Sequence, residues 1–176
     1  VEKRSLKVSE IKIDKDILDN IGDRQCGIYA DEYGSLWLYT RYGDDIYRRQ
    51  KGGDIWHKFT LPTFNSNIVN SIRKIGSDAK GHLWIATDKF GIYVYNYADG
   101  SIDNIQKSAN GGAGLVSNNV NTICPDHEGN IWIGYYKLGM SVTSDTMLKR
   151  FKLRYHEMGD INTLLCDSRG EVWIGT

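Results

Sequence analysis

Four short stretches together provide aromatic, charged and amide side chains, a combination that suits recognition of a sugar. Aromatic rings offer flat apolar faces to the CH groups of a sugar ring, and charged or amide groups offer the partners that hydroxyl groups need. We therefore predict a ligand-binding surface made by Arg41, Tyr42, Asp44, Asp88, Lys89, Phe90, Asn118, Asn119, Tyr136 and Lys137. The alternative is that each is an ordinary exposed loop residue.

Patterns that would support catalysis are missing from the sequence. It contains no Gly-x-Ser-x-Gly elbow, no glycine-rich phosphate loop and no His-Glu-x-x-His motif. Asp44 and Asp45 are adjacent carboxylates, but a glycosidase needs two carboxyls about 5 to 10 Å apart across a sugar, and neighbouring side chains usually point apart. Its histidines lack ligand spacing, so we expect no catalytic residue, no metal site and no cofactor.

Charge and hydropathy narrow the classes of partner. The 176 residues hold 22 basic and 22 acidic side chains, so no overall field draws the chain to nucleic acid or to an anionic membrane. No apolar run approaches the roughly 18 residues that a membrane helix needs. The chain begins at Val1 and not at Met, so the lack of a visible signal peptide is uninformative.

The three cysteines leave two interpretations open. Cys26, Cys124 and Cys166 form no Cys-x-x-Cys pair. They are either small buried residues in strands, which we favour, or two of them form a disulfide between neighbouring repeats.

The predicted binding residues lie beside a pattern that recurs four times. Trp37, Trp84, Trp132 and Trp173 follow one another at intervals of 47, 48 and 41 residues, each within a Gly-x-apolar-Trp-apolar stretch. An Asp stands three residues before each of these glycines, and Asp-x-x-Gly between two apolar runs predicts a hairpin turn. A repeat of this length indicates a repetitive architecture.

Each repeat reads as four short strands, and no helical period extends over ten residues. Four antiparallel strands with a Gly and Trp signature are typical of a β-propeller blade, and consecutive apolar residues around each Trp indicate a strand covered on both faces. We therefore predict an all-β fold, a β-propeller segment of about three and a half blades that leaves the ring incomplete. The predicted boundaries are an outer strand of a preceding blade at 1–22, blades at 23–65, 66–115 and 116–158, and half a blade at 159–176.

The repeat resembles the two-component regulator propeller repeat. The resemblance rests on Asp-x-x-Gly-x-apolar-Trp, on Gly91 and Gly139 seven residues after Trp84 and Trp132, and on the lead-in Gly114-Leu115-Val116-Ser117. It implies a periplasmic sensor region of a hybrid histidine kinase, without catalytic activity in this segment, whose ligand is an oligosaccharide. It also implies contact with the rest of the propeller, a possible homodimer, and a membrane helix only elsewhere in the parent chain.

Two other functions stay open at this stage. Streptogramin-lyase-like propellers share a similar Asp-x-x-Gly-x-x-Trp motif, which makes a propeller lyase or hydrolase the enzyme alternative. A non-catalytic scaffold for protein interaction is the third. An incomplete ring would expose apolar faces and strand edges, so we expect either a longer polypeptide, which we favour, or closure of the ring between chains.

Overall fold

The computed structural model describes residues 10–41, 43–62, 71–108, 114–143, 151–154 and 159–176. Its elements are α1 (Lys15–Ile21), β1 (Cys26–Ala30), β2 (Leu36–Thr40), β3 (Ile46–Arg49), β4 (Trp56–Lys58), β5 (Ile72–Ser77), β6 (His82–Thr87), β7 (Ile92–Asn96), β8 (Ile102–Ile105), β9 (Val120–Pro125), β10 (Ile131–Tyr135), β11 (Met140–Thr143), β12 (Phe151–Arg154), β13 (Thr163–Cys166) and β14 (Val172–Gly175).

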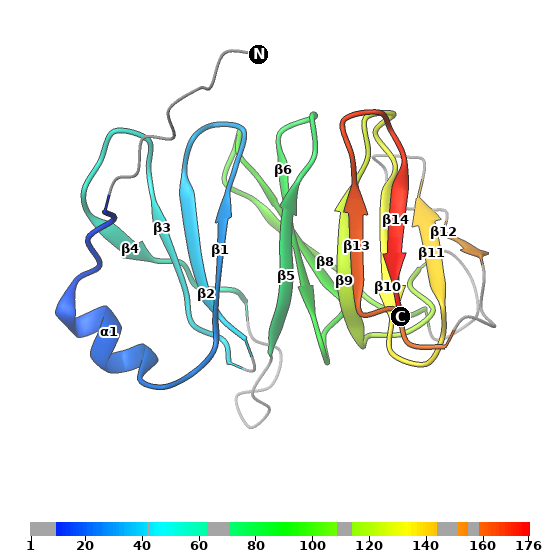
Figure 1. Ribbon diagram of the computed structural model, residues 1–176, viewed down its shortest axis with the longest axis horizontal. Coiled ribbons are helices and arrows are strands. Elements are labelled where there is room, and N and C mark those ends of the chain that lie inside the picture. The colour runs from blue at the N-terminus through cyan, green and yellow to red at the C-terminus, as the bar shows by residue number, and fades with distance from the viewer. Residues whose placement is uncertain (1–9, 42, 63–70, 109–113, 144–150, 155–158) are drawn as a thin grey trace, which may run out of the picture.

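These strands form separate antiparallel sheets that follow chain order. β1 to β4, β5 to β8 and β9 to β12 each make a four-stranded meander, and β13 pairs with β14. Figure 1 shows the sheets standing side by side, with β1, β5 and β13 upright along the front, and the sheets of the described residues do not close into a ring. The predicted all-β propeller segment with an incomplete ring is confirmed.

The predicted outer strand at 1–22 is wrong over the part that the structure describes. Residues 10–14 lie outside any strand, and α1 follows them, while residues 1–9 lie outside the described residues. Ile17 and Ile21 stand four residues apart and are both buried, against Leu38, Tyr47 and Trp56. That spacing places two side chains on one helical face, and their contact with the first sheet stabilises a helix where a strand was predicted.

The core lies between sheets, as the apolar strands around each Trp predict. Trp84 is 2% exposed and packs with residues of β9 and β10 such as Val120 and Ile133. Trp37 is fully buried against β5 and β6 of the next sheet. The predicted strand covered on both faces is confirmed, and Trp84 is a packing residue between blades.

Each Asp turn is tied to its Trp by a hydrogen bond that the sequence pattern did not predict. The indole Nε1 donates to the Asp Oδ2 at 2.9 Å for Trp37 and Asp31, and the same bond joins Trp84 to Asp78, Trp132 to Asp126 and Trp173 to Asp167 at 2.9, 2.8 and 3.3 Å. The other carboxylate oxygen accepts a backbone N–H four residues on. The glycines of these turns, Gly34, Gly81, Gly129 and Gly170, have φ between 80° and 90°, a region that glycine enters without strain.

A disulfide joins neighbouring sheets. Cys124 of β9 is bonded to Cys166 of β13, with their Cα atoms 6.3 Å apart, whereas Cys26 is a free and exposed thiol. The disulfide between neighbouring repeats, the less favoured of the two interpretations, is therefore the one observed.

None of the helical residues described here forms a helix with the length and apolar character needed to cross a bilayer.

Candidate ligand-binding site

The first two strands of each repeat form a hairpin that we call the inner hairpin: β1–β2, β5–β6, β9–β10 and β13–β14. The Asp turn closes one end of each inner hairpin, which we call the turn end. Two positions of the repeat lie at the opposite end. The first stands eleven residues before each Trp, where the innermost strand begins, and is occupied by Cys26, Arg73, Asn121 and Asn162. The second stands four residues after the Trp, just beyond the second strand, and is occupied by Arg41, Asp88 and Tyr136. The innermost strands are neighbours, with β5 packed beside β9 and β9 beside β13. Side chains at these two positions therefore meet across the sheets.

Arg73 and Asn121 sit in β-bulges. Ile72 pairs with Thr87 and Lys74 with Ala86, so Arg73 has no residue opposite it in β6. Asn121 is skipped in the same way, because Val120 pairs with Tyr135 and Thr122 with Gly134. An extra residue breaks the two-residue alternation of a strand and redirects its side chain, a device common beside functional sites.

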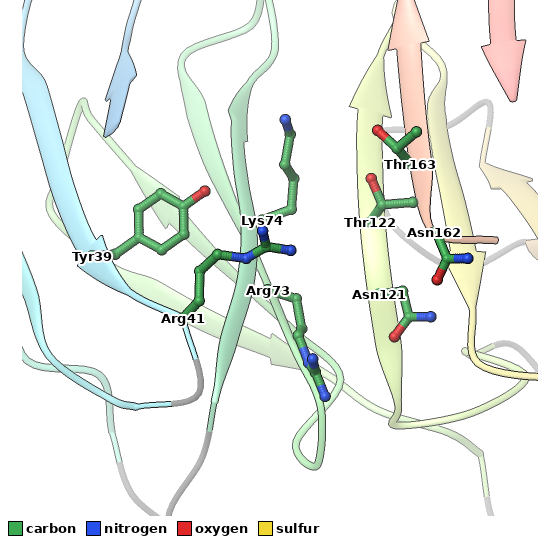
Figure 2. Close-up of a pocket in the computed structure, with 8 residues that line it drawn as sticks. All are labelled: Tyr39, Arg41, Arg73, Lys74, Asn121, Thr122, Asn162 and Thr163. Carbon is green, nitrogen blue, oxygen red and sulfur yellow. The ribbon is translucent and has the colours of Figure 1, made fainter. Parts of the chain in front are cut away.

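These side chains line a pocket of about 250 Å³ between the sheets. Figure 2 shows Arg41 reaching from the end of β2 toward β5, with Asn121 and Asn162 on the far side of the pocket and Lys74 directed away from both guanidinium groups. An adjoining hollow of about 240 Å³ shares four of these residues and adds Tyr136. We call the two hollows the inner-strand pocket, and its lining residues are Tyr39, Arg41, Arg73, Lys74, Asn121, Thr122, Tyr136, Asn162 and Thr163.

In the first blade, the large and small residues of one cross-strand pair are swapped relative to the later blades. Gly27 pairs with Tyr39, whereas the matching pairs in later blades are Lys74 with Ala86 and Thr122 with Gly134. A Cβ atom at Gly27 would collide with the Tyr39 ring, so this glycine admits the ring. Tyr39 thus fills a place that an inner-strand side chain takes elsewhere.

The pocket carries more positive than negative charge. Its lining includes Arg41, Arg73 and Lys74 and no carboxylate. Arg73 forms an ion pair with Asp88, at 3.6 Å between Nη2 and Oδ2. Burial raises the pKa of Tyr39 above its usual value, and the charge of Arg41 opposes part of this rise, so the Tyr39 hydroxyl stays protonated at neutral pH.

Five of the nine residues that line the pocket lie in segments that match a family model. Residues 114–137 and 158–176 match the model named two component regulator propeller. These two segments are similar to two-component regulator propeller repeats. They contribute Asn121, Tyr136 and Asn162, and the resemblance read from the sequence is confirmed.

Solved structures of similar shape include extracellular domains of bacterial one-component and two-component systems. The extracellular domain of the hybrid two-component system BT4673 from B. thetaiotaomicron is 26% identical over 84% of this chain and 21% of its own, with a TM-score of 0.63. Another BT4673 extracellular-domain structure, described as a one-component system, gives 16% identity over 85% and 20% of the two chains, with a TM-score of 0.66. This chain thus spans about a fifth of those structures.

An enzyme shares the propeller fold. Virginiamycin B lyase from Staphylococcus aureus is 15% identical over 86% of this chain and 48% of its own, with a TM-score of 0.61. At this identity the likeness concerns the fold alone. No curated protein matches the sequence significantly.

Of the ten residues predicted for the site, Arg41 and Tyr136 line the pocket that the propeller repeats help to form. Lys137 lies next to them, with its Nζ 4.9 Å from the centre of the exposed Tyr136 ring. Asp88 contacts the pocket through its ion pair with Arg73. The structure therefore brings together part of the predicted surface.

The other predicted residues lie outside this pocket. The carbonyl oxygen of Asn118 accepts from the Gly91 N–H of the preceding sheet at 3.0 Å, and that of Asn119 accepts from the Tyr136 N–H at 3.5 Å, within its own sheet. Phe90 packs partly buried against the Trp37 cluster. Asp44 and Lys89 are exposed and do not line the pocket, and Tyr42 lies outside the described residues.

The adjacent carboxylates Asp44 and Asp45 have separate roles. Asp45 is buried and forms ion pairs with Arg24 at 2.7 Å and Lys58 at 3.2 Å. Burial, the largest single effect, raises its pKa, but hydrogen bonds from Asn20, Lys58 and Arg24 together hold the pKa below its usual value. Asp45 is thus a structural ion-pair partner and not one of a catalytic pair.

Four lining residues were not predicted from the sequence: Arg73, Lys74, Asn121 and Asn162. They lie at the start of the innermost strands, whereas the prediction looked only at connecting loops. Aligning the repeats on Trp would have revealed Arg73, Asn121 and Asn162, because the position eleven residues earlier holds a polar residue in each of the last three copies.

Proposed function

We propose that this chain is a ligand-sensing segment of the extracellular region of a two-component receptor, and that the inner-strand pocket recognises an oligosaccharide. The identified repeats and the 26% identity to the BT4673 extracellular domain support the sensor role. The histidine kinase would lie elsewhere in a longer polypeptide.

The pocket itself is the observation that carries the proposal. It presents two guanidinium groups, two amide side chains and the Tyr136 ring from neighbouring blades. Arginine and asparagine side chains bind hydroxyl oxygens in defined directions, and an aromatic face packs against sugar CH groups. Residues from several blades would have to contact one ligand, so binding would stabilise one arrangement of those blades.

The lining favours binding over turnover. Among the described residues that form the pocket there is no histidine and no carboxylate, the groups that most often move protons near neutral pH. His82 and His127 lie at the opposite end, bonded to Asp78 and to the Asp167 carbonyl oxygen. Within the described residues, no cluster of three potential metal ligands is found. The lyase interpretation thus lacks a catalytic group at this pocket.

A periplasmic location fits this role. The BT4673 structures are of extracellular domains. The bond between Cys124 and Cys166 is of a kind that persists in oxidising compartments. A membrane helix elsewhere in the polypeptide would then connect the propeller to a kinase.

Signalling would follow from unequal affinity for two arrangements of the receptor. A ligand shifts such an equilibrium only to the extent that it binds one state more tightly. We propose a homodimer as the unit that changes arrangement, with the remaining propeller blades as the direct neighbours of this segment.

Titration calorimetry of the complete receptor against a panel of neutral and acidic oligosaccharides tests the proposal. Saturable binding with no chemical change of the sugar, checked by chromatography of the recovered ligand, is the expected result. Recovery of cleaved sugar would instead support the lyase or hydrolase, and absence of any binding would support the scaffold.

A further inference from the structure

We propose that the inner-strand pocket binds an anionic group of its ligand, a carboxylate or sulfate carried by an acidic oligosaccharide. The saccharide part of this inference rests on the proposed function, whereas the anion part depends only on the pocket.

The charge of the lining is the first argument. The chain as a whole is neutral, with 22 basic and 22 acidic residues, yet three cations and no carboxylate line this pocket. Arg73 is partly balanced by Asp88 at 3.6 Å. Arg41 and Lys74 form no ion pair within the part of the chain that the structure describes. A net positive charge is therefore left for a ligand to neutralise.

The donors around the pocket match an oxyanion better than a neutral hydroxyl. Guanidinium groups present N–H donors in a planar fork that fits two oxygens of a carboxylate or sulfate. Arg41 and Arg73 enter from one side, and the amides of Asn121 and Asn162 lie on the other (Figure 2). These two amide side chains have no hydrogen-bond partner among the described residues and can donate to the same anion.

A buried hydroxyl points to the same chemistry. Thr122 is 2% exposed and lines the pocket, and its Oγ1 has no hydrogen-bond partner among the described residues. A Cβ atom at Gly134 would lie 2.7 Å from the Thr122 methyl group, so the methyl faces β10. A buried hydroxyl without a partner costs free energy, and a rotation of the side chain about χ1 that brought Oγ1 to a ligand oxygen would recover it.

The β-bulges direct the side chains of Arg73 and Asn121 toward the pocket. The extra residue in β5 is Arg73 and the extra residue in β9 is Asn121, which are register equivalents in adjacent blades. Without these bulges the regular alternation would continue, as it does in β1, where Cys26 pairs with Thr40. The departure from regular pairing therefore coincides with the side chains that would hold the anion.

A second hollow of about 460 Å³ offers a contrast at the turn end. It is lined by Arg48 and Lys80 beside Tyr33 and Tyr97. The Arg48 guanidinium lies 5.2 Å from the Trp37 ring centre and 5.1 Å from that of Tyr97. Its charge is thus already stabilised by two aromatic faces. Lys80 is accordingly a matched control, because its removal changes the net charge equally but at the other hollow.

The test is calorimetric titration of the complete receptor with trigalacturonate, a sulfated disaccharide, neutral maltotriose and sodium sulfate. Acidic ligands should bind at least about tenfold more tightly than maltotriose, and their affinity should fall as salt screens the charges. Arg41→Gln and Asn162→Asp, both at exposed positions, should each weaken binding of the acidic ligands about tenfold or more. The first removes a cation that pairs with the anion, and the second adds a negative charge that repels it. Lys80→Gln should leave the affinity unchanged.

The outcomes separate the two proposals. Equal affinity for maltotriose and trigalacturonate, unaffected by Arg41→Gln, would keep the sensor and overturn the anion site. Loss of binding in Lys80→Gln alone would also overturn it. Binding of sulfate that depends on Arg41, with no binding of any sugar, would retain the anion site and refute oligosaccharide recognition; absence of binding by every probe would refute both.

Discussion

The two ends of the inner hairpins differ in what they repeat. At the turn end, the same Asp to Trp bond occurs in four copies, from Asp31 and Trp37 to Asp167 and Trp173. At the other end, equivalent positions hold different residues, among them Arg73, Asn121 and Asn162. Repetition at one end fixes the blade, and variation at the other provides a surface that distinguishes ligands. The two ends should therefore respond differently to mutation.

The largest effect is expected at a buried Trp of the turn end. Trp84→Ala removes a side chain that is 2% exposed and should lower the free energy of unfolding by about 3 to 5 kcal/mol, as measured by denaturant titration. Trp173 carries the same hydrogen bond but is 57% exposed, so in the same 176-residue chain Trp173→Ala should cost less than about 1 kcal/mol. A loss below about 1 kcal/mol for Trp84→Ala would mean that burial between blades is not what stabilises the repeat.

The disulfide sets the next largest effect. Changing both Cys124 and Cys166 to Ser frees two sheets that are linked over 42 residues and should cost about 2 to 4 kcal/mol in the same titration. Cys26→Ser is the control, because this exposed free thiol should have no effect. If alkylation without prior reduction modified all three cysteines, the bond and the predicted cost would both be refuted.

Removing one Asp of the turn end should produce a smaller and pH-dependent effect. Burial, the largest single effect, raises the pKa of Asp126, but hydrogen bonds from Asn130, Trp132 and the backbone together hold the pKa below its usual value. A lowered pKa contributes stability above the unfolded-state value of about 3.9, and that stability is lost as pH falls through the folded-state pKa. Asp126→Asn should cost about 1 to 2 kcal/mol at pH 7.

The variant should also lose less stability than the wild type on acidification. Denaturant titrations at pH 7 and near pH 3 measure this difference. Parallel losses in the two proteins would show that Asp126 does not contribute through its charge.

The smallest effect on stability is expected at the pocket end. Asn162 is exposed and its side chain has no partner among the described residues, so Asn162→Ala should change the free energy of unfolding by less than about 0.5 kcal/mol. Its effect should appear in ligand affinity. A destabilisation above about 1 kcal/mol would show that the pocket end also holds the blade together.

The turn end could be predicted from sequence because its signals are local. Asp31 and Gly34 lie within one turn, and Trp37 follows in the same hairpin, so spacing alone identifies them. The bond from Trp37 to Asp31 was not predicted, because the pattern gives the strand but not the direction of the indole N–H. The helix α1 was missed because its two buried residues, Ile17 and Ile21, depend on contacts with a sheet more than fifteen residues away.

The pocket end could be predicted only in part. Arg41 and Tyr136 follow their strands directly, and loop position was enough to find them. Arg73 and Asn121 share a repeat position that alignment can find, but the direction of their side chains depends on bulges, which are features of strand pairing and leave no mark in a single strand's composition. The exchange between Gly27 and Tyr39 likewise needs both strands in register.

Hydrogen–deuterium exchange of the complete receptor, with and without a saturating acidic oligosaccharide, tests most directly that the ends have separate roles. We expect added protection to concentrate in peptides covering Arg41, Arg73, Asn121, Tyr136 and Asn162. Peptides covering the turns at Asp31, Asp78, Asp126 and Asp167 should exchange as before. Protection centred on those turns, with none at the inner-strand pocket, would contradict separate roles for the two ends.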